Sequence, residues 1–333
     1  MPVPPRPTSR VPVTGPAPRR RALAVLMAAL LGAANAAALE GAEGEVAAQP
    51  PARPLTLRDA VVLGVVEGVT EYLPVSSTGH LILASRALGL DGGRWGNDEG
   101  ARALAAFEII IQSGAVLAVL GLYWRRVRQM ILGVLGRDRE GLRLVGLLLL
   151  AFLPSALAGL AAHDAIKARL FSPSPVALAL AVGGVMMLAV DALGLGRRAA
   201  AGPAGGGFEI RIGQALFIGL FQCLALWPGT SRSMVTIVGG VLADLPLVQA
   251  AEFSFLLALP TLGMATAYEA VGSRGELLAY VGPAELTVGL VVSGVVAALS
   301  VRGLVRWLTG HGLWPFGVYR IGLAAVVLWL LGR

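Results

Sequence analysis

Charged residues are scarce in this chain of 333 residues, and cysteine and lysine are almost missing. Asp, Glu, Lys and Arg together make up 14% of the residues, whereas 56% are hydrophobic. A soluble domain would carry about 25% charged residues. Cys223 is the single cysteine, which excludes an internal disulfide framework and a cysteine-based metal site. With a mean hydropathy of +0.74, the composition favours a polytopic helical membrane protein.

The net charge of +7 comes almost entirely from arginine, because Lys167 is the one lysine. A basic chain can bind nucleic acid, but these arginines lie beside apolar segments and form no solvated basic face, so we expect no nucleic-acid partner. Loops rich in arginine stay in the cytoplasm. The predicted cytoplasmic loops carry Arg125, Arg126, Arg128, Arg137, Arg139, Arg143, Arg197, Arg198, Arg211, Arg302 and Arg306, whereas the intervening loops hold Lys167, Arg169 and Arg274.

The first residues differ in kind from the rest. Residues 1–38 combine a Pro-rich start, three arginines at 19–21, an apolar run and small residues, the order found in a signal peptide with cleavage after Ala36 or Ala38. A dispensable N-terminal extension or a misassigned start codon explains them equally well. Residues 39–54 are expected to be a flexible lead-in. The membrane-embedded domain is therefore predicted to span residues 55–333.

Polar residues concentrate where the apolar segments are short or broken. One motif runs from Glu67 to His80, and a second runs from Trp227 to Met234. Irregular backbone at membrane depth is tolerated only where protein or water satisfies it, so two re-entrant helical hairpins fit better than simple crossings. About six full transmembrane helices remain. The apolar segments lie at about 57–73, 81–90, 107–124, 143–162, 175–195, 210–226, 233–243, 253–271, 284–301 and 316–331.

The two halves of the chain echo each other around these motifs. Gly64-Val-Val-Glu67 leads to Pro74, and Gly219-Leu-Phe-Gln222 leads to Pro228, although pairing the two prolines needs a shift of one residue. Paired broken helices at corresponding positions are typical of inverted repeats with a site at their interface. We therefore predict an all-α fold of inverted repeats. A transporter shares this design and is the competing interpretation, but it needs binding groups and no nucleophile.

The first motif supplies candidate reactive groups. Glu67 and Glu71 lie four residues apart on one helix face among apolar neighbours, so they need a proton, a metal ion or a distant cation such as Arg232. Ionisable groups in such segments mark a site by default. The hydroxyls of residues 76–78 precede a helix start, where free N–H groups bind anions or the hydroxyls simply cap the helix. His80, three residues after Ser77, could be its general base or could protonate a leaving oxygen.

The second motif repeats this design with a cation. Arg232 lies among hydroxyls at a predicted helix start, an arrangement that suits a phosphate clamp better than an arginine reaching the membrane surface. Gln112 either lines the same site or makes an interhelical hydrogen bond. Together the motifs contain the groups used in phosphoryl transfer. The candidate substrate-binding residues are Ser76, Thr78, Thr230, Ser231, Ser233 and Gln112.

At these residues the chain closely resembles the undecaprenyl-diphosphate phosphatase family associated with bacitracin resistance. The resemblance covers roughly residues 57–333, and Met234 departs from it where the family usually has glycine. It is carried by Glu67-Gly-Val-Thr-Glu-Tyr-Leu-Pro-Val-Ser-Ser-Thr-Gly-His80, Phe107-Glu-Ile-Ile-Ile-Gln112, Trp124-Arg-Arg126, Pro228-Gly-Thr-Ser-Arg-Ser233, Phe253-Ser-Phe-Leu-Leu-Ala-Leu-Pro260 and Tyr319-Arg-Ile321.

The resemblance implies a bacterial inner-membrane enzyme that hydrolyses undecaprenyl diphosphate to the monophosphate and inorganic phosphate, which recycles the lipid carrier of peptidoglycan synthesis. It also implies a site open to the periplasm and dependence on a divalent cation, Mg or Ca, which Glu67 and Glu71 would carry. Whether Ser77 or water attacks phosphorus stays open, and so does a homodimer. The implied catalytic residues are Glu67, Glu71, Ser77, His80 and Arg232.

Overall fold

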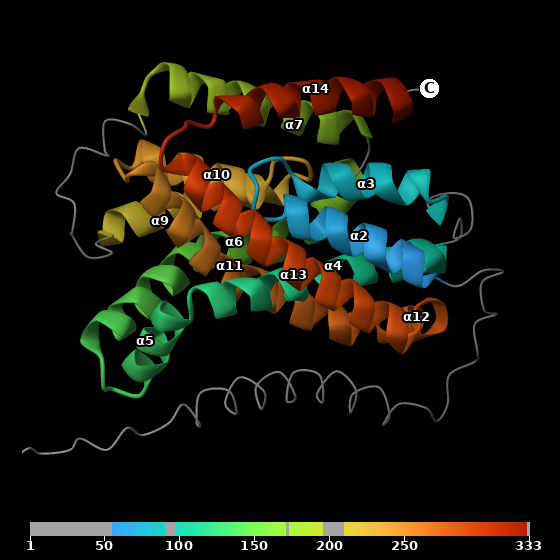
Figure 1. Ribbon diagram of the computed structural model, residues 1–333, viewed down its shortest axis with the longest axis horizontal. Helices are drawn as coiled ribbons and strands as arrows, with labels where there is room; N and C mark the ends of the chain where they lie inside the picture. Colours follow the sequence, from blue (N-terminus) through green and yellow to red (C-terminus); the bar gives the residue numbers. More distant parts are fainter. Residues whose placement is uncertain (1–54, 91–97, 171–172, 196–209, 332–333) are drawn as a thin grey trace, which may run out of the picture. The chain divides into compact units, whose positions relative to one another are not determined.

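The computed structural model describes residues 55–90, 98–170, 173–195 and 210–331. The predicted signal peptide at 1–38, the lead-in at 39–54, and Arg197 and Arg198 lie outside these residues. The described chain is all-helical, as predicted (Figure 1). Its helices are α2 (Leu57–Thr70), α3 (Ser77–Ala87), α4 (Asp98–Leu122), α5 (Trp124–Val134), α6 (Arg139–Leu170), α7 (Pro173–Ala192), α9 (Ile212–Gln222), the 3₁₀ helix η3 (Cys223–Leu226), α10 (Arg232–Leu242), α11 (Leu247–Gly272), α12 (Arg274–Tyr280), α13 (Pro283–Leu308) and α14 (Trp314–Leu331).

Several helices are long and apolar enough to cross a membrane. Among the described residues, five such spans occur, and α14 belongs with α9 and α10 to the shorter apolar helices. The expected number was about six, and α14, an apolar helix of 18 residues, would be the sixth. The five spans are Glu99–Leu122, Arg139–Ala162, Ser174–Ala192, Leu247–Gly272 and Pro283–Leu308.

Two short helices correct the sequence analysis, which assigned their residues to loops. α5 carries Arg125, Arg126 and Arg128, and it buries Val127 and Gly133 against the rest of the protein. α12 lies in the stretch that was expected to link two crossings. Both are too short and too polar to stand out by hydropathy, because an amphipathic helix shows its apolar face only at helical spacing.

Small residues let three helices pack with their backbones nearly touching. A Cβ atom at Gly64 would lie 2.8 Å from the carbonyl oxygen of Gly289, and one at Gly68 would lie 2.6 Å from that of Ser293, so α2 lies directly on α13. Gly114 brings α4 equally close to the backbone of Leu290. Close backbone approach is a main source of helix association where no hydrophobic effect separates helix from lipid. These glycines fix where α2 presents its polar end.

The helices α4 and α11 run antiparallel. Thr266 Oγ1 donates to the Ile109 carbonyl at 3.2 Å, and the rings of Tyr123 and Phe255 lie 6.2 Å apart at the other end of the pair. α5 follows α4 at one end of the helical body, and α12 follows α11 at the opposite end (Figure 1). We call these the α5 end and the α12 end.

The two broken helix pairs start from opposite ends. The chain enters α2 at the α12 end, where Leu55 N–H donates to the Tyr280 carbonyl at 3.2 Å. It enters α9 at the α5 end, where Arg143 donates to the Ile210 carbonyl at 3.0 Å. Gln214 then bonds the Ala243 carbonyl at 2.7 Å, so α10 returns to the end from which α9 came. The polar turns of both pairs therefore lie in the interior.

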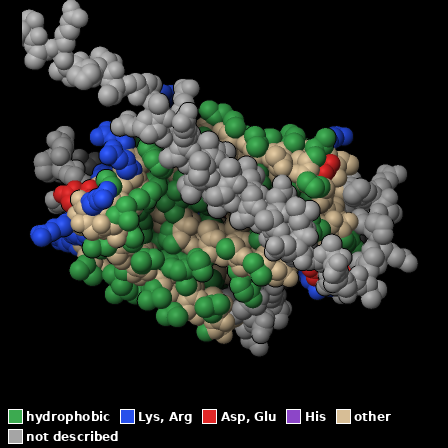
Figure 2. Space-filling view, turned by 90° about the horizontal axis from the view of Figure 1, so that it is seen from below, with side chains coloured by type: hydrophobic (Ala, Val, Ile, Leu, Met, Phe, Trp, Pro, Cys, Tyr) green, Lys and Arg blue, Asp and Glu red, His purple; other side chains and the backbone are tan. Residues whose placement is uncertain are grey.

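Exposed apolar side chains form stripes along the long helices. They recur at helical spacing, as in Leu149, Leu153 and Leu157 of α6 and Val291, Val295 and Leu299 of α13. Hydrophobic side chains dominate the face shown in Figure 2, and basic side chains gather toward one end of it. Such stripes would be an aggregation hazard in water and are expected where a helix faces lipid.

Replacing Gly114 with alanine should destabilise the protein by about 1–3 kcal/mol, because the new methyl group overlaps the α13 backbone. The thermal unfolding midpoint in detergent measures this. Gly121→Ala on the same helix is the matched control, since a Cβ atom there meets nothing within 4 Å. Equal midpoints for the two variants would contradict the proposed role of close backbone packing.

Candidate active site

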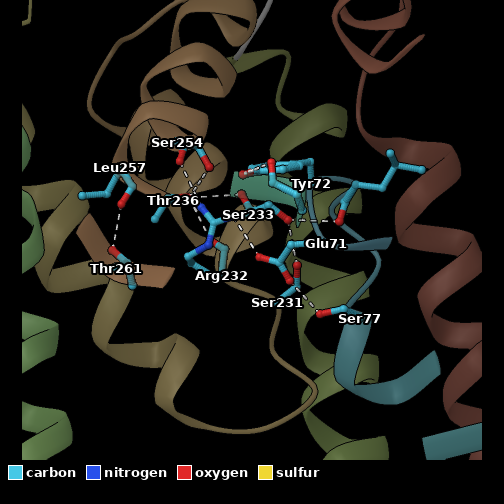
Figure 3. Close-up of polar contacts among 12 residues, drawn as sticks. Glu71, Tyr72, Ser77, Ser231, Arg232, Ser233, Thr236, Ser254, Leu257 and Thr261 are labelled. Carbon is cyan, nitrogen blue, oxygen red and sulfur yellow. Dashed lines mark hydrogen bonds and ion pairs between the residues drawn. The ribbon is translucent and has the colours of Figure 1, made fainter. Parts of the chain in front are cut away.

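The two polar motifs meet through an ion pair between Glu71 and Arg232. Arg232 Nη2 lies 3.1 Å from Glu71 Oε1, and both side chains are more than nine-tenths buried. The other carboxylate oxygen of Glu71 accepts a hydrogen bond of 2.8 Å from the Ser77 hydroxyl. Figure 3 shows Ser77, Glu71 and Arg232 in one continuous chain of contacts. The sequence predicted that Glu67 and Glu71 need a partner such as Arg232, and Arg232 is that partner for Glu71.

Arg232 is oriented by further contacts. Its Nη1 donates to the Ser254 carbonyl at 3.0 Å, and its guanidinium carbon lies 5.6 Å from the centre of the Tyr72 ring. Tyr72 is fully buried and donates to the Ala115 carbonyl at 3.1 Å. Among the described residues, the Nε–H of Arg232 has no hydrogen-bond partner. The guanidinium is therefore rigidly held and keeps one donor for a ligand.

Glu67 is fully buried, and neither of its carboxylate oxygens has a hydrogen-bond partner in the described part of the chain. Glu71, Glu108 and Arg232 lie within electrostatic reach of it, and the side chain of Gln112 lies beside it. Leaving a buried carboxylate unsatisfied is costly. A proton, a cation or a ligand donor would relieve that cost.

These residues fit a hard divalent cation only with help from a ligand. Within the described ranges, no three His, Cys, Asp or Glu side chains form a metal cluster. Glu67 offers two free carboxylate oxygens and Glu71 lies one turn further along the chain. Mg²⁺ is commonly held by one or two carboxylates, with waters and substrate phosphate oxygens completing its shell. The donor set therefore suits a cation that arrives with a phosphorylated substrate.

The helices that follow the two turns begin in the same unusual way. Ser76 and Ser231 have φ angles of 76° and 73°, in the left-handed region that non-glycine residues rarely adopt. Each serine hydroxyl caps its own helix, accepting from Gly79 N at 3.5 Å and from Met234 N at 3.3 Å. Met234, the departure from the family pattern, therefore fits the cap without disturbing it.

This shared geometry corrects the register of the internal repeat. Because Ser76 matches Ser231, Pro74 matches Gly229 and not Pro228, and the one-residue shift disappears. Glu67 then corresponds to Gln222, and Ser77 to Arg232. The two turns share one backbone conformation but carry different side chains.

Of the remaining candidate hydroxyls, that of Ser233 joins the two motifs, whereas for Thr230 and Thr78 the structure shows only their burial. Ser233 donates to the Leu73 carbonyl at 3.0 Å and lies 3.0 Å from the Ser231 hydroxyl, so it ties the second motif to the first. Thr230 is buried in the turn before α10, and Thr78 is half-buried on α3. The bonds of Ser231 and Ser233 support the turns, which a capping role alone also requires.

Both ring nitrogens of His80 are engaged by groups other than the Ser77 hydroxyl. Its Nδ1 lies 2.6 Å from the Ser76 carbonyl oxygen, and its Nε2 lies 2.6 Å from the Tyr319 hydroxyl. The hydroxyl of Ser77 is bonded to Glu71 instead. The carboxylate, not the imidazole, is therefore the group positioned to take the serine proton in this structure.

Arg320 is a site-supporting residue that the sequence analysis missed. It is fully buried in α14 and donates to the Pro74 carbonyl at 3.4 Å and to the Gly229 carbonyl at 2.9 Å, the matching positions of the two turns. Further bonds reach the Ala179 and Leu180 carbonyls of α7 at 3.1 and 3.3 Å. A single guanidinium thus holds both irregular turns in place. An arginine inside an apolar segment is itself a signal that could have found it.

Comparison with known proteins gives one consistent result. The family model described as "Bacitracin resistance protein BacA" matches residues 60–326. A protein of Sorangium cellulosum named "Undecaprenyl-diphosphatase" is 50% identical over 273 residues, which cover 82% of this chain and 85% of the relative. One of the same name from Novosphingobium aromaticivorans is 43% identical, over 84% of this chain and 99% of the relative. "Undecaprenyl-diphosphatase 2" of Rhodospirillum rubrum is 45% identical, over 81% and 93%.

Arg320→Met should lower the stability by about 3 kcal/mol or more, because it leaves several buried carbonyls without donors. Amide hydrogen exchange should accelerate in both turns at once, at residues 72–79 and 227–234. Arg302→Met removes an exposed arginine and is the matched control. Faster exchange in only one turn would contradict a shared anchor.

Proposed function

The chain belongs to the bacitracin resistance protein BacA family, as its motifs indicated, and we propose that it hydrolyses undecaprenyl diphosphate to undecaprenyl phosphate and inorganic phosphate. The observation that carries this proposal is the continuous contact from Ser77 through Glu71 to Arg232. It unites a hydroxyl, a carboxylate and a guanidinium in the interior, at two helix starts. This reaction returns the lipid carrier to peptidoglycan synthesis, and the family name links it to bacitracin resistance.

Arg232 and the helix starts of α3 and α10 would bind the diphosphate. The free Nε–H of Arg232 and the first N–H groups of both helices are donors suited to phosphate oxygens. Fixed donors aimed at developing negative charge are the largest contribution in most enzymes of this chemistry. The hydroxyls of residues 76, 78, 230, 231 and 233, with Gln112, would complete the binding set.

The geometry favours Ser77 as the nucleophile and Glu71 as its base. Attack of Ser77 Oγ on the terminal phosphorus would transfer its proton to Glu71 and break the bond to the bridging oxygen, which leaves with undecaprenyl phosphate. Water would then hydrolyse the phosphoserine, release inorganic phosphate and restore Ser77. Direct attack by water is the alternative, with Ser77 and Glu71 orienting it. His80, one helical turn beyond Ser77, would accept the proton of the attacking water or donate a proton to the oxygen that leaves with undecaprenyl phosphate.

A divalent cation such as Mg or Ca would be held by Glu67 and Glu71 together with substrate oxygens. Once bound, it supplies charge neutralisation at the phosphoryl oxygens. The support for this part of the proposal is the unpartnered Glu67 carboxylate. Gln222, at the matching position of the other repeat, is instead hydrogen-bonded at both ends of its amide: Nε2 donates to Ser155 Oγ at 2.6 Å, and Oε1 accepts from Thr261 at 3.5 Å.

We further propose inverted repeats in an inner membrane with the site reached from the periplasm. If α14 spans with α4, α6, α7, α11 and α13, each repeat has an odd number of crossings, which inverts the second repeat. Re-entrant pairs starting from opposite ends agree with this arrangement. The described arginines of α5 and those after it lie at the α5 end, so that end would be cytoplasmic and the α2–α3 pair would open to the periplasm.

Purified protein in detergent should release phosphate from undecaprenyl diphosphate, and Ser77→Ala, Glu71→Gln and Arg232→Gln should each slow release by about 100-fold or more, since each removes a group of the reacting centre. Ser300→Ala is the control, because its hydroxyl bonds only its own helix. A phosphate label trapped on Ser77 would establish it as the nucleophile. Normal turnover in all three variants would reject this site, and binding of the lipid with no phosphate release would favour the transporter.

Glu67→Gln should make the cation-free protein more stable by about 1–3 kcal/mol while lowering its activity, because it replaces an unpaired buried carboxylate with a neutral amide. Unfolding midpoints with chelator and with added Mg²⁺ measure the change in stability. The rate of phosphate release and the Mg²⁺ concentration at which it is half-maximal measure the change in activity. Glu99→Gln, at the start of α4, is the control. If the unfolding midpoint of the unaltered protein does not change when Mg²⁺ is added, cation binding at Glu67 is contradicted.

A further inference from the structure

His80 is held between two helices by partners at both ring nitrogens. The Ser76 carbonyl lies 2.6 Å from Nδ1, and the Tyr319 hydroxyl lies 2.6 Å from Nε2. A carbonyl only accepts, so Nδ1 carries the proton, and in a neutral ring Nε2 is then the acceptor for the tyrosine hydroxyl. The two rings also stack, with centres 5.6 Å apart and planes 4° from parallel. Both the tautomer and the orientation of the imidazole are therefore set.

Both partners of His80 are themselves fixed. Ser76 is held in its left-handed backbone conformation at the start of α3. Tyr319 precedes Arg320, which is fully buried and bonded to the carbonyls of both turns. The backbone at Tyr319 is thus placed by the same anchor that places the turns. About half of the Tyr319 side chain remains exposed, so this tyrosine is not simply buried as packing.

The other repeat has no such pair. Its position matching His80 is Val235, which is fully buried in α10. The matching cap, Ser231, has almost the same backbone conformation as Ser76, yet no imidazole follows it. Holding the helix start therefore does not require a histidine or a tyrosine partner. The pair belongs to the chemistry of the first motif.

Resting on the phosphatase function proposed above, we propose that Tyr319 is the positioning residue for His80. Its hydroxyl and the Ser76 carbonyl keep the ring in one orientation and in the tautomer with Nδ1 protonated. A tyrosine hydroxyl donates to a bare Nε2 and accepts from Nε2–H, so the contact persists in both protonation states.

Tyr319→Phe should lower kcat about tenfold and leave KM unchanged, since it removes the orienting hydroxyl but no substrate contact. Tyr268→Phe, an exposed tyrosine on α11, is the matched control and should match the unaltered enzyme. In a protein that already carries His80→Asn, adding Tyr319→Phe should not lower kcat any further, because the tyrosine acts through the imidazole. If the fold-decrease in kcat of the double variant equals the product of the two single decreases, the proposal is overturned and Tyr319 has an independent role.

A spectroscopic readout separates this proposal from the proposed function. The chain has only 3 histidines, so nitrogen-15 labelling of histidine gives few ring signals. Tyr319→Phe should shift the His80 Nε2 signal, assigned by its loss in His80→Asn, whereas Tyr268→Phe should not. An unmoved signal in a variant that unfolds at the normal temperature would overturn the positioning role, even with robust phosphate release. A shifted signal without phosphate release in any form would reject the phosphatase function and leave the His80–Tyr319 contact standing.

Discussion

The ion pair between Glu71 and Arg232 is the interaction on which the site depends. It joins the end of a helix that starts at the α12 end of the protein to the start of a helix that returns to the α5 end. Two charges so deeply buried are stable only when each is also hydrogen-bonded, and here Ser77 and the Ser254 carbonyl supply those bonds. Removing either partner would strand a charge in the interior, so the two turns hold their places together.

Arg320 supplies hydrogen-bond donors to backbone carbonyls of the two turns. A helix that breaks at membrane depth leaves carbonyls that neither lipid nor a neighbouring strand can satisfy. Gly183 leaves room for the guanidinium, because a Cβ atom there would collide with its Nη2. One side chain then serves matching carbonyls of both repeats, at Pro74 and Gly229. The irregular backbone that forms the site is thus stabilised by a residue that contributes none of its reactive groups.

The sequence predicted the all-helical fold and pointed to the two polar motifs that the structure brings together, for physical reasons that also explain the misses. Polar motifs in apolar segments identified Glu67, Glu71 and Arg232, because charge is rare at such positions unless it serves a site. The helix α5 was missed because alternating arginine and apolar residues average to the hydropathy of a loop. The contact between His80 and Tyr319 was beyond local patterns, since 239 positions separate them and only the packing of α14 brings them together.

The matched positions of the α2–α3 and α9–α10 pairs carry different side chains. Glu67 corresponds to Gln222, Ser77 to Arg232 and His80 to Val235, so similar turns carry a carboxylate, a hydroxyl and an imidazole in one half of the chain and a guanidinium in the other. Gln222 is buried and bonded to Ser155 and to Thr261, whereas the described structure offers no hydrogen bond to Glu67. A neutral amide makes this position purely structural, while a carboxylate makes it unstable without a ligand. The ion pair between Glu71 and Arg232 then joins the two turns, with a carboxylate from one and a guanidinium from the other.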